Sequence, residues 1–469
     1  MSNHTKPSWQ LRPGERRLLI TVGDFLFACF SFVIAVYVWA VAQVDTVPLM
    51  DFIQSRLQNW FFLLPVVWII LLVDSYDSRT SSDLRKTVRS ISISALIGAG
   101  IYLVIYFASD QSLPRRGVAA FLGSAYLLTL LWRMIYIWIF SGPRFMHSVM
   151  IVGAGETGKA MVEVINSIKP PYKLVGLVDD DLDKLEESIG GYKVMGTCQQ
   201  LMSLAETNNV SEIIVAITGR MLPATFQILL EAQEKGMIIT RMPVAYEELL
   251  ERVPVDYLEA DWILRSFVNE SRVSAAYTVT NRLIDLLGGA VGVLGTMVLF
   301  PFISLAILLE SGRPVTFRQT RAGKGGIPFT ILKFRTMYQG NRIGKLEEMT
   351  QEDDDRVTPI GRFLRKTHLD ETLQFINVLR GDMSLVGPRP ELPDLVDYFQ
   401  QHIPFYRARL LAKPGITGWS QNHISYAANI DETKIKLEYD LYYIKHRTIL
   451  MDIGIILRTF ASVLGFRGR

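Results

Sequence analysis

Two adjacent carboxylates, Asp370 and Glu371, are the residues of this chain best suited to chemistry. They lie in a run, residues 355–390, that also holds several arginines, among them Arg365 and Arg389, and a Gly-Pro-Arg-Pro turn. Phosphoryl transfer needs an oxygen nucleophile or base at phosphorus, cations that offset charge on the phosphoryl oxygens, and usually a divalent metal. The run therefore predicts chemistry at a phosphate.

Further cations precede and follow this pair. Lys333 and Arg335 alternate with Phe334 on an expected strand over residues 329–337, so both cations share one face and the ring faces the core. They are candidate phosphate ligands, with a solvated strand face as the alternative. Arg389 is flanked by prolines, so its guanidinium loses little entropy when it grips a phosphate with two hydrogen bonds. A surface arginine after a loop is the alternative there.

The acids are expected at the start of a helix. Thr367 followed by Asp370 has the spacing of a capping box, in which the threonine is the N-cap. Free amides and the helix dipole at such a terminus offset the repulsion between a carboxylate and an anionic phosphate. Neighbouring helix positions point in different directions, so Asp370 and Glu371 are expected to have separate duties.

Three motifs in order carry a family resemblance: KFRTM at residues 333–337, the run at 355–390, and KPGITG at 413–418. From residue 274 onward the chain resembles the bacterial sugar transferases, or monotopic phosphoglycosyl transferases. That family moves a hexose-1-phosphate from a nucleotide sugar onto a polyprenyl phosphate. The resemblance implies a UDP-sugar and undecaprenyl phosphate as substrates, Mg²⁺ as the metal, and the start of capsule, exopolysaccharide or O-antigen synthesis.

Residue roles follow from the same resemblance. Asp370 is the nucleophile that attacks the sugar-linked phosphorus, expels UMP and forms an aspartyl phosphosugar. Glu371 positions or deprotonates the acceptor, and both acids are expected to hold Mg²⁺. The expected substrate-binding residues are Lys333, Arg335, Arg365, Arg389 and Asp440. The residues after Gly418 depart from the common family continuation, which leaves the transferred sugar open.

Composition sets the wider frame. At 469 residues the chain has room for about three domains. Its 49% hydrophobic content is concentrated in blocks that indicate membrane segments. The net charge of +3 gives no ground for a nucleic-acid partner, whereas membrane lipids are expected to contact the apolar blocks. Cys29 and Cys198 support neither a disulfide framework nor a metal cluster, which suits cytoplasmic soluble parts.

Four apolar stretches come first, at residues 18–42, 60–73, 91–108 and 118–140. Each is near the ~20 residues that a helix needs to cross a bilayer, although the second is short unless it is extended upstream. Cations concentrate before the first stretch, between the second and third, and after the fourth, which predicts a cytoplasmic N-terminus and an inner-membrane location. Asp24 and Arg133 fall within or near spans, and are expected to pair inside the bundle or to lie near an interface.

Residues 148–268 alternate between expected strands and helices, as in a parallel Rossmann-like sheet. The expected strands lie at 149–152, 174–178, 213–217 and 237–242. A GxGxxG loop at 153–158 and acids at 179–181 fit nucleotide binding, in which the glycines admit a pyrophosphate and the acid holds a ribose. A tight turn in a degenerate scaffold is an equal alternative, and the domain is expected to be regulatory or an assembly module.

The membrane returns at residues 283–309, where Pro301 interrupts an apolar stretch. A crossing would carry the C-terminal domain away from nucleotide sugars. We therefore expect a re-entrant helix that breaks near Phe300 and Pro301 and returns to the cytoplasmic face, as the resemblance also implies. An ordinary kinked span is the alternative. Residues 449–466 alternate at helical spacing and are expected to lie along the membrane surface.

The sequence thus predicts a membrane protein of the α plus α/β class. Its expected parts are a four-helix transmembrane bundle at 1–144, a Rossmann-like cytoplasmic domain at 145–273, a re-entrant membrane hairpin at 274–312, and a small α/β catalytic domain with a C-terminal interfacial helix at 313–469. Two other functions stay open, namely a membrane-anchored nucleotide-sugar dehydratase or epimerase and a non-enzymatic regulator of polysaccharide assembly. A homodimer is one candidate assembly.

Overall fold

The computed structural model describes residues 13–41, 59–76, 83–108, 115–140, 146–168, 172–219, 221–258, 262, 264–269, 274–338, 356–424 and 429–464. The chain forms two compact units, Met1–Leu250 and Glu251–Arg469. The predicted membrane orientation depends partly on cations that lie outside the described residues, namely Lys6, Arg12, Arg79 and Arg144.

The first unit begins with helices that pack around an apolar core. They are α1 (Pro13–Val41), α3 (Leu64–Leu71), α5 (Leu84–Ala108) and α6 (Arg115–Phe140). Trp68, Leu72, Ile91 and Phe121 form the centre of this core and are at most 2% exposed. The helix faces turned away from the core carry exposed apolar side chains such as Leu26. Apolar residues on both faces are typical of helices that lie in lipid.

Three of the described helices are long and apolar enough to cross a membrane, judged by length and composition. They cover Gly14–Val41, Arg115–Phe140 and Ala275–Ser311. Helix α5 is not among them, and three cations lie within its first turns, Arg85, Lys86 and Arg89. The segment Phe61–Leu71 is apolar but shorter. A complete four-helix transmembrane bundle therefore stays a prediction.

Asp24 and Arg133 pair inside the bundle, as expected. The Arg133 Nη2 lies 2.7 Å from the Asp24 Oδ2, and its Nε lies 3.3 Å from Oδ1. The Arg133 Nη1 also donates to the Ser75 carbonyl oxygen over 3.0 Å, and both charged side chains are fully buried. A buried charge needs a partner and satisfied hydrogen bonds, and this pair supplies both.

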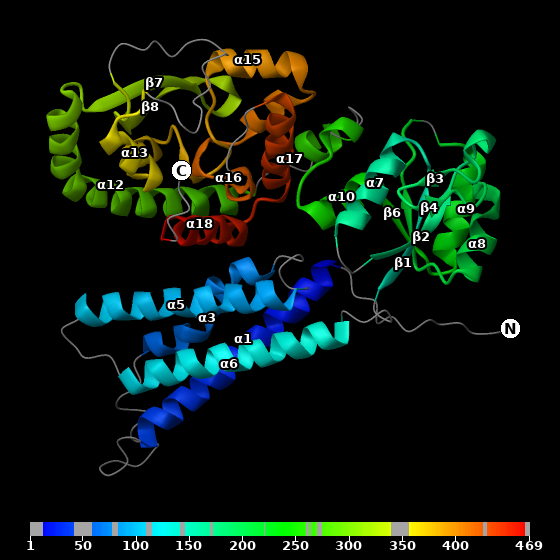
Figure 1. The fold of residues 1–469 in the computed structure, drawn as a ribbon, viewed down its shortest axis with the longest axis horizontal. Coiled ribbons are helices and arrows are strands. Elements are labelled where there is room, and N and C mark those ends of the chain that lie inside the picture. Colours follow the sequence, from blue (N-terminus) through cyan, green and yellow to red (C-terminus); the bar gives the residue numbers. More distant parts are fainter. Residues whose placement is uncertain are drawn as a thin grey trace. The chain divides into compact units, whose positions relative to one another are not determined.

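A parallel four-stranded sheet follows, in the order β2-β1-β5-β6 (Figure 1). Its strands are β1 (His147–Val152), β2 (Tyr172–Val178), β5 (Glu212–Val215) and β6 (Ile238–Arg241). The helices of this domain are α7 (Glu156–Ser167), α8 (Leu201–Thr207), α9 (Pro223–Glu234) and α10 (Met242–Leu250). A short hairpin, β3 (Ser188–Ile189) and β4 (Tyr192–Lys193), follows β2. The predicted parallel sheet is confirmed.

The glycine loop after β1 is a tight turn. A Cβ on Gly158 would lie 2.0 Å from the Gly153 carbonyl oxygen, and one on Gly153 would lie 2.7 Å from the Ala216 carbonyl oxygen. The carboxylate of Asp179, at the end of β2, accepts a 2.6 Å hydrogen bond from the amide of Ala154 in that loop. The acid predicted to hold a ribose thus contacts the loop itself. Nucleotide binding by this domain stays a prediction.

The residues after Leu250 pack on the second unit. Val253, Val255 and Phe267 are at most 2% exposed and belong to the same core as Leu437. The sequence predicted that the sheet domain ends at residue 273. The described residues after Leu250 instead complete the core of the C-terminal unit, so the first unit ends near residue 250.

Helix α12 (Ala275–Ser311) runs for 37 residues and contains Pro301. The sequence predicted a break in the helix near Pro301, but the helical backbone continues through this residue. The ribbon of α12 curves before it reaches the next strand (Figure 1). Proline bends a helix because it removes one backbone donor and clashes with the preceding turn. A return to the same membrane face stays a prediction.

The rest of the second unit is a small α/β assembly. Strands β7 (Thr316–Ala322) and β8 (Pro328–Phe334) form an antiparallel hairpin, and β9 (Ser384–Val386) pairs in parallel with β10 (Gly415–Thr417). The helices are α13 (Pro359–Lys366), α14 (Gln374–Arg380), α15 (Pro393–His402), α16 (Trp419–His423), α17 (Ile430–His446) and α18 (Ile449–Leu464). Phe334 faces the core at 1% exposure, as expected.

Candidate active site

The two acids lie in a short 3₁₀ turn, Leu369–Glu371, between α13 and α14. His368 precedes it in the left-handed region, with φ of 56°. The predicted capping box is wrong. Thr367 ends α13, and its hydroxyl donates to the Phe363 carbonyl oxygen four residues back over 2.9 Å. The dyad therefore lies just before a helix, and a left-handed residue rather than a threonine cap turns the chain into it.

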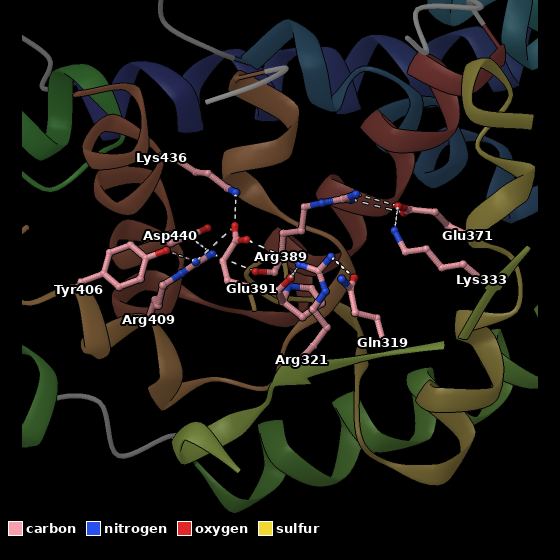
Figure 2. Close-up of polar contacts among 11 residues, drawn as sticks. Gln319, Arg321, Lys333, Glu371, Arg389, Glu391, Tyr406, Arg409, Lys436 and Asp440 are labelled. Atoms are coloured by element: carbon pink, nitrogen blue, oxygen red, sulfur yellow. Dashed lines mark hydrogen bonds and ion pairs between the residues drawn. The ribbon is translucent and has the colours of Figure 1, made fainter. Parts of the chain in front are cut away.

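Glu371 is gripped by two cations that come from different elements. Lys333, at the end of β8, places its Nζ 2.6 Å from Oε1 of Glu371. Arg389 reaches the same carboxylate with both guanidinium nitrogens, Nη2 to Oε1 at 2.7 Å and Nη1 to Oε2 at 3.4 Å (Figure 2). Burial alone would raise the pKa of Glu371, but Arg389 and Lys333 outweigh it and hold that pKa well below its usual range.

Asp370 has the opposite environment. Across the part of the chain that the structure describes, its carboxylate has no hydrogen-bond partner, and the residue is 8% exposed. Burial, and then the charge of Glu371, raise the pKa of Asp370 to about 6, although Lys333, Arg365 and Arg389 act in the other direction. Two neighbouring acids thus have pKa values that their surroundings push apart. Such a split is typical of carboxylates with separate catalytic duties.

A second charged network holds the turn that carries Arg389 (Figure 2). The Arg409 Nη2 donates to the Arg389 carbonyl oxygen over 3.0 Å, and the Arg321 Nη1 donates to the Pro390 carbonyl oxygen over 3.2 Å. Glu391 lies among these cations, with its Oε1 2.7 Å from Lys436 Nζ. The turn is therefore fixed through its backbone, which leaves the guanidinium of Arg389 free to face the dyad.

Asp440 belongs to this second network. Its Oδ2 accepts a 2.8 Å hydrogen bond from Arg409, and its Oδ1 accepts a 2.6 Å bond from the Ser420 hydroxyl. The residue is only 1% exposed. The predicted role as a substrate contact does not match this position, because both oxygens are occupied inside the core. Asp440 acts on the Arg389 turn through Arg409.

Arg335 also differs from its predicted role. Its Nη2 donates to the carbonyl oxygens of Ser311 and Gly312 over 2.7 and 2.6 Å, at the end of α12. A cation suits the negative end of a helix. Arg335 and Lys333 are close in sequence but reach different partners. Arg365, in the last turn of α13, donates to the Thr336 hydroxyl over 3.0 Å. Its positive charge lowers the pKa of Asp370.

The KPGITG motif forms a backbone-to-backbone contact with the Gly-Pro-Arg-Pro turn. A Cβ on Gly415 would lie 2.1 Å from the Gly387 amide nitrogen, and one on Gly387 would lie 2.2 Å from the Lys413 carbonyl oxygen. Side chains at either position would force the loops apart. Gly415–Thr417 of this motif forms strand β10, and the glycines allow the close backbone approach that places Arg389.

Sequence reasoning missed Arg321, Glu391, Arg409 and Lys436. Glu391 directly follows the Gly-Pro-Arg-Pro turn, and that position was the one available signal. The others lie on three separate elements, β7, the 3₁₀ segment Tyr406–Leu411 and α17. Their spacing in the sequence carries no periodicity that would bring them together.

The described residues fit a Mg²⁺ ion only in part. Among them no group of three or more His, Cys, Asp or Glu side chains comes together. Glu371 does not fit as a ligand, because Lys333 and Arg389 already engage its carboxylate. The carboxylate of Asp370 has no hydrogen-bond partner among the described residues and could serve as a ligand. Mg²⁺ is commonly held by one or two carboxylates together with substrate phosphates and water. The site thus suits a metal that arrives with a diphosphate.

Known families and proteins match parts of this chain in sequence. The family model for bacterial sugar transferases matches residues 276–466, and a model described as a CoA-binding domain matches residues 71–239. A UDP-glucose:undecaprenyl-phosphate glucose-1-phosphate transferase of Caulobacter vibrioides is 41% identical over 191 residues, which are 40% of this chain and 71% of that protein. The chain belongs to the bacterial sugar transferase family.

Two longer matches extend the comparison of this sugar transferase. A UDP-N-acetylgalactosamine-undecaprenyl-phosphate N-acetylgalactosaminephosphotransferase of Aeromonas hydrophila is 41% identical over 224 residues, or 48% of this chain and 52% of that protein. An undecaprenyl-phosphate glucose phosphotransferase of Komagataeibacter xylinus is 30% identical across 67% of this chain and 59% of its own length. The match thus spans little more than half of each relative, and the relatives are named for different sugars.

Proposed function

We propose that this sugar transferase moves a hexose-1-phosphate from a UDP-sugar to undecaprenyl phosphate, giving undecaprenyl-diphosphate-sugar and UMP. The Asp370 carboxylate attacks the sugar-linked phosphorus, and the bond from that phosphorus to the bridging oxygen breaks, so that UMP leaves. A phosphate oxygen of undecaprenyl phosphate then attacks the same phosphorus, and the bond to Asp370 breaks and frees the carboxylate. The reaction is the first membrane step of capsule, exopolysaccharide or O-antigen synthesis.

The unequal dyad is the observation that carries this proposal. Asp370 has no hydrogen-bond partner among the described residues, so its lone pairs are available for attack. Its pKa of about 6 leaves it ionised at neutral pH. Glu371 is held ionised by two cations, and a carboxylate with so low a pKa is a weak base. Its duty is therefore to hold Lys333 and Arg389 beside the nucleophile rather than to take a proton.

The cations match the charge of the reaction. The charges of Lys333, Arg365 and Arg389 all lower the pKa of Asp370 and so favour its ionised form. Each of these cations can also offset charge on the phosphoryl oxygens of a diphosphate. The acceptor phosphate is ionised at neutral pH and needs no general base. Bound Mg²⁺, held by Asp370 and the donor diphosphate, would supply further charge neutralisation on the phosphoryl oxygens.

Placement of α12 in the inner membrane as a re-entrant helix is part of the proposal. One face of α12 is buried along most of its length, from Asp285 through Thr296 to Ile307, against elements of its own unit. The opposite face exposes large apolar side chains such as Val291, at 71%, and Leu309, at 80%. A full crossing would carry the polar elements packed on α12 into hydrocarbon, where backbone groups lack partners. These observations support a helix that enters and returns on the cytoplasmic side, where UDP-sugars occur.

The function is tested with the full-length protein in detergent. It is incubated with undecaprenyl phosphate, Mg²⁺ and UDP-glucose, UDP-galactose or UDP-N-acetylhexosamines, and UMP is measured. We expect UMP release with at least one donor, and loss of at least about 10³-fold in Asp370→Asn. The matched control is Asp397→Asn, whose side chain is 64% exposed on α15. Full activity in Asp370→Asn would remove the nucleophile and with it the mechanism.

A further inference from the structure

One face of α12 runs along the segment that joins the dyad to the Arg389 turn. It is formed by Arg282, Asp285, Gly289, Gly292 and Thr296, whose alternating separations of three and four residues put them on one side of a helix. The segment that it faces, residues 372–385, contains α14 and the first residues of β9. It begins directly after Glu371, and its strand leads within a few residues to Arg389.

Arg282 holds the end of α14. Its Nη1 donates to the Val378 carbonyl oxygen and its Nη2 to the Leu379 carbonyl oxygen, both over 2.8 Å. The last carbonyl groups of a helix lack partners within the helix, and a cation is favoured beside them. One guanidinium on the membrane helix thus fixes two backbone groups of the catalytic unit.

Asp285, one turn further along, holds the start of β9. Its Oδ1 accepts hydrogen bonds from the Ser384 hydroxyl over 2.9 Å and from the Leu385 amide over 2.8 Å. The side chain is buried at 3% exposure. Arg282 and Asp285 therefore grip the two sides of the turn between α14 and β9.

Gly292 and Thr296 of this α12 face contact the beginning of the segment 372–385. A Cβ on Gly292 would lie 2.3 Å from the Phe375 ring, so the glycine lets α14 approach α12 closely. The Thr296 hydroxyl lies 3.2 Å from the carbonyl oxygen of Thr372, the residue directly after Glu371. Contacts from α12 thus reach both ends of residues 372–385.

We infer that Arg282 and Asp285 are positioning residues of the transferase, which hold the Arg389 turn at its working distance from Glu371 and Asp370. They do so through the turn between α14 and β9, because that turn is the direct chain connection between the dyad and Arg389. The helix that enters the membrane thereby sets the geometry of the active site. This inference rests on the proposed transferase function.

The first test is Arg282→Ala in the full-length protein. We expect UMP release to fall about 10- to 100-fold, as for a small misplacement of catalytic groups, with the KM for UDP-sugar within about twofold. If Arg389 moves away from the dyad, the loss should therefore fall on kcat and not on the KM.

A role in stability alone would lower the amount of folded protein and leave kcat per folded protein unchanged. A folded Arg282→Ala variant with the wild-type kcat therefore overturns the inference. The exposed Arg318 of β7 provides the matched control, and Arg318→Ala should change neither kcat nor the KM. If the wild-type protein releases no UMP with any donor, the proposed function fails instead, so the two failures are distinguishable.

Two further pairs keep the inference testable if Arg282→Ala does not fold. Both contacts of Asp285 reach a single oxygen, which Asn retains, so Asp285→Asn should keep near-wild-type rates and Asp285→Ala should not. Gly292→Ala and Gly295→Ala form the second pair, because both changes raise the intrinsic helix propensity of α12 by the same amount. Only the first would displace a neighbour, because a Cβ on Gly295 meets nothing within 4 Å. Equal rates of UMP release in the two glycine variants would contradict the inference.

Discussion

Arg389 and Glu371 form a two-pronged ion pair, with Nη2 2.7 Å from Oε1 and Nη1 3.4 Å from Oε2. Because each guanidinium nitrogen meets its own oxygen, the arginine has a fixed orientation beside the dyad. Asp370, the residue before Glu371, has a carboxylate with no hydrogen-bond partner among the residues that the structure describes. This relationship, rather than the presence of two acids alone, divides the duties of the dyad.

The first prediction concerns this ion pair. Lysine is a point charge and cannot reproduce a two-pronged contact. We expect Arg389→Lys to slow UMP release at least about tenfold and Arg389→Ala to slow it about 10²- to 10³-fold, the effect of losing a donor to developing charge. Steady-state kinetics measure both, with Arg407→Lys, 56% exposed, as the control. Wild-type rates in Arg389→Lys would show that the orientation of the guanidinium does not matter.

The second prediction is a pH dependence. Burial and the charge of Glu371 raise the pKa of Asp370 to about 6, and the nucleophile must be ionised. Below that pH the carboxylate is protonated, so the rate should fall about tenfold for each pH unit, and above it the rate should level off. The pKa of Glu371 is held far lower, so this acid stays ionised throughout. The measurement is kcat/KM for the donor against pH, with thermal unfolding at each pH to exclude denaturation. A rate that is flat from pH 7 to about 5 contradicts the assignment of Asp370.

The third prediction concerns the network behind the Arg389 turn. Asp440→Ala removes the closer of two carboxylates from Arg409, which is only 3% exposed, and Glu391 stays 3.7 Å from the Arg409 Nη1. Removal of one member of a buried pair costs about 3–5 kcal/mol of the free energy of unfolding, and the remaining Glu391 should keep the loss near or below the lower end of that range. We expect slower UMP release as well, because Arg409 holds the Arg389 carbonyl oxygen. Denaturant unfolding and UMP assays measure the two effects. In the control, Asp397→Ala should cost less than about 1 kcal/mol, because its ion pair with Arg407 is exposed.

The fourth prediction concerns the membrane bundle. Asp24→Leu leaves the fully buried Arg133 without a carboxylate and should lower the free energy of unfolding by about 3–5 kcal/mol. The double variant Asp24→Leu/Arg133→Leu removes both charges and should recover most of that loss. Thermal unfolding in detergent compares the three proteins. If the double variant is less stable than the single one, the pair is not the reason for the burial of these residues.

Much of the site was predictable from the sequence. The acids, Lys333 and Arg389 lie in distinct motifs, and the resemblance over those motifs assigned them to one site. The structure brings both cations onto Glu371, a contact that the sequence did not predict. The parallel sheet was predictable as well, because its four apolar strands alternate with helices at regular spacing.

Other features were not predictable, for a physical reason. Arg335 was assigned from its place on an expected strand and Asp440 from the resemblance, whereas burial and hydrogen-bonding partners decide their roles, and neither is visible in a local pattern. Arg335 donates to a carbonyl oxygen at the C-terminal end of α12, and Asp440 accepts a hydrogen bond from Arg409. The capping box at Thr367 failed because the preceding helix α13 uses that threonine at its own end. The contacts of Arg282 and Asp285 join residues about a hundred positions apart, beyond any local signal.

The most direct test of the account is to trap the covalent intermediate. The full-length protein is incubated with Mg²⁺ and a UDP-sugar that supports UMP release, without undecaprenyl phosphate, and is then quenched and digested for peptide mass spectrometry. The account predicts one equivalent or less of UMP and a hexose-phosphate adduct on the Asp370 peptide. The adduct should be absent from Asp370→Asn and should disappear when undecaprenyl phosphate is added. An unmodified Asp370 in protein that goes on to complete the full reaction would contradict the account.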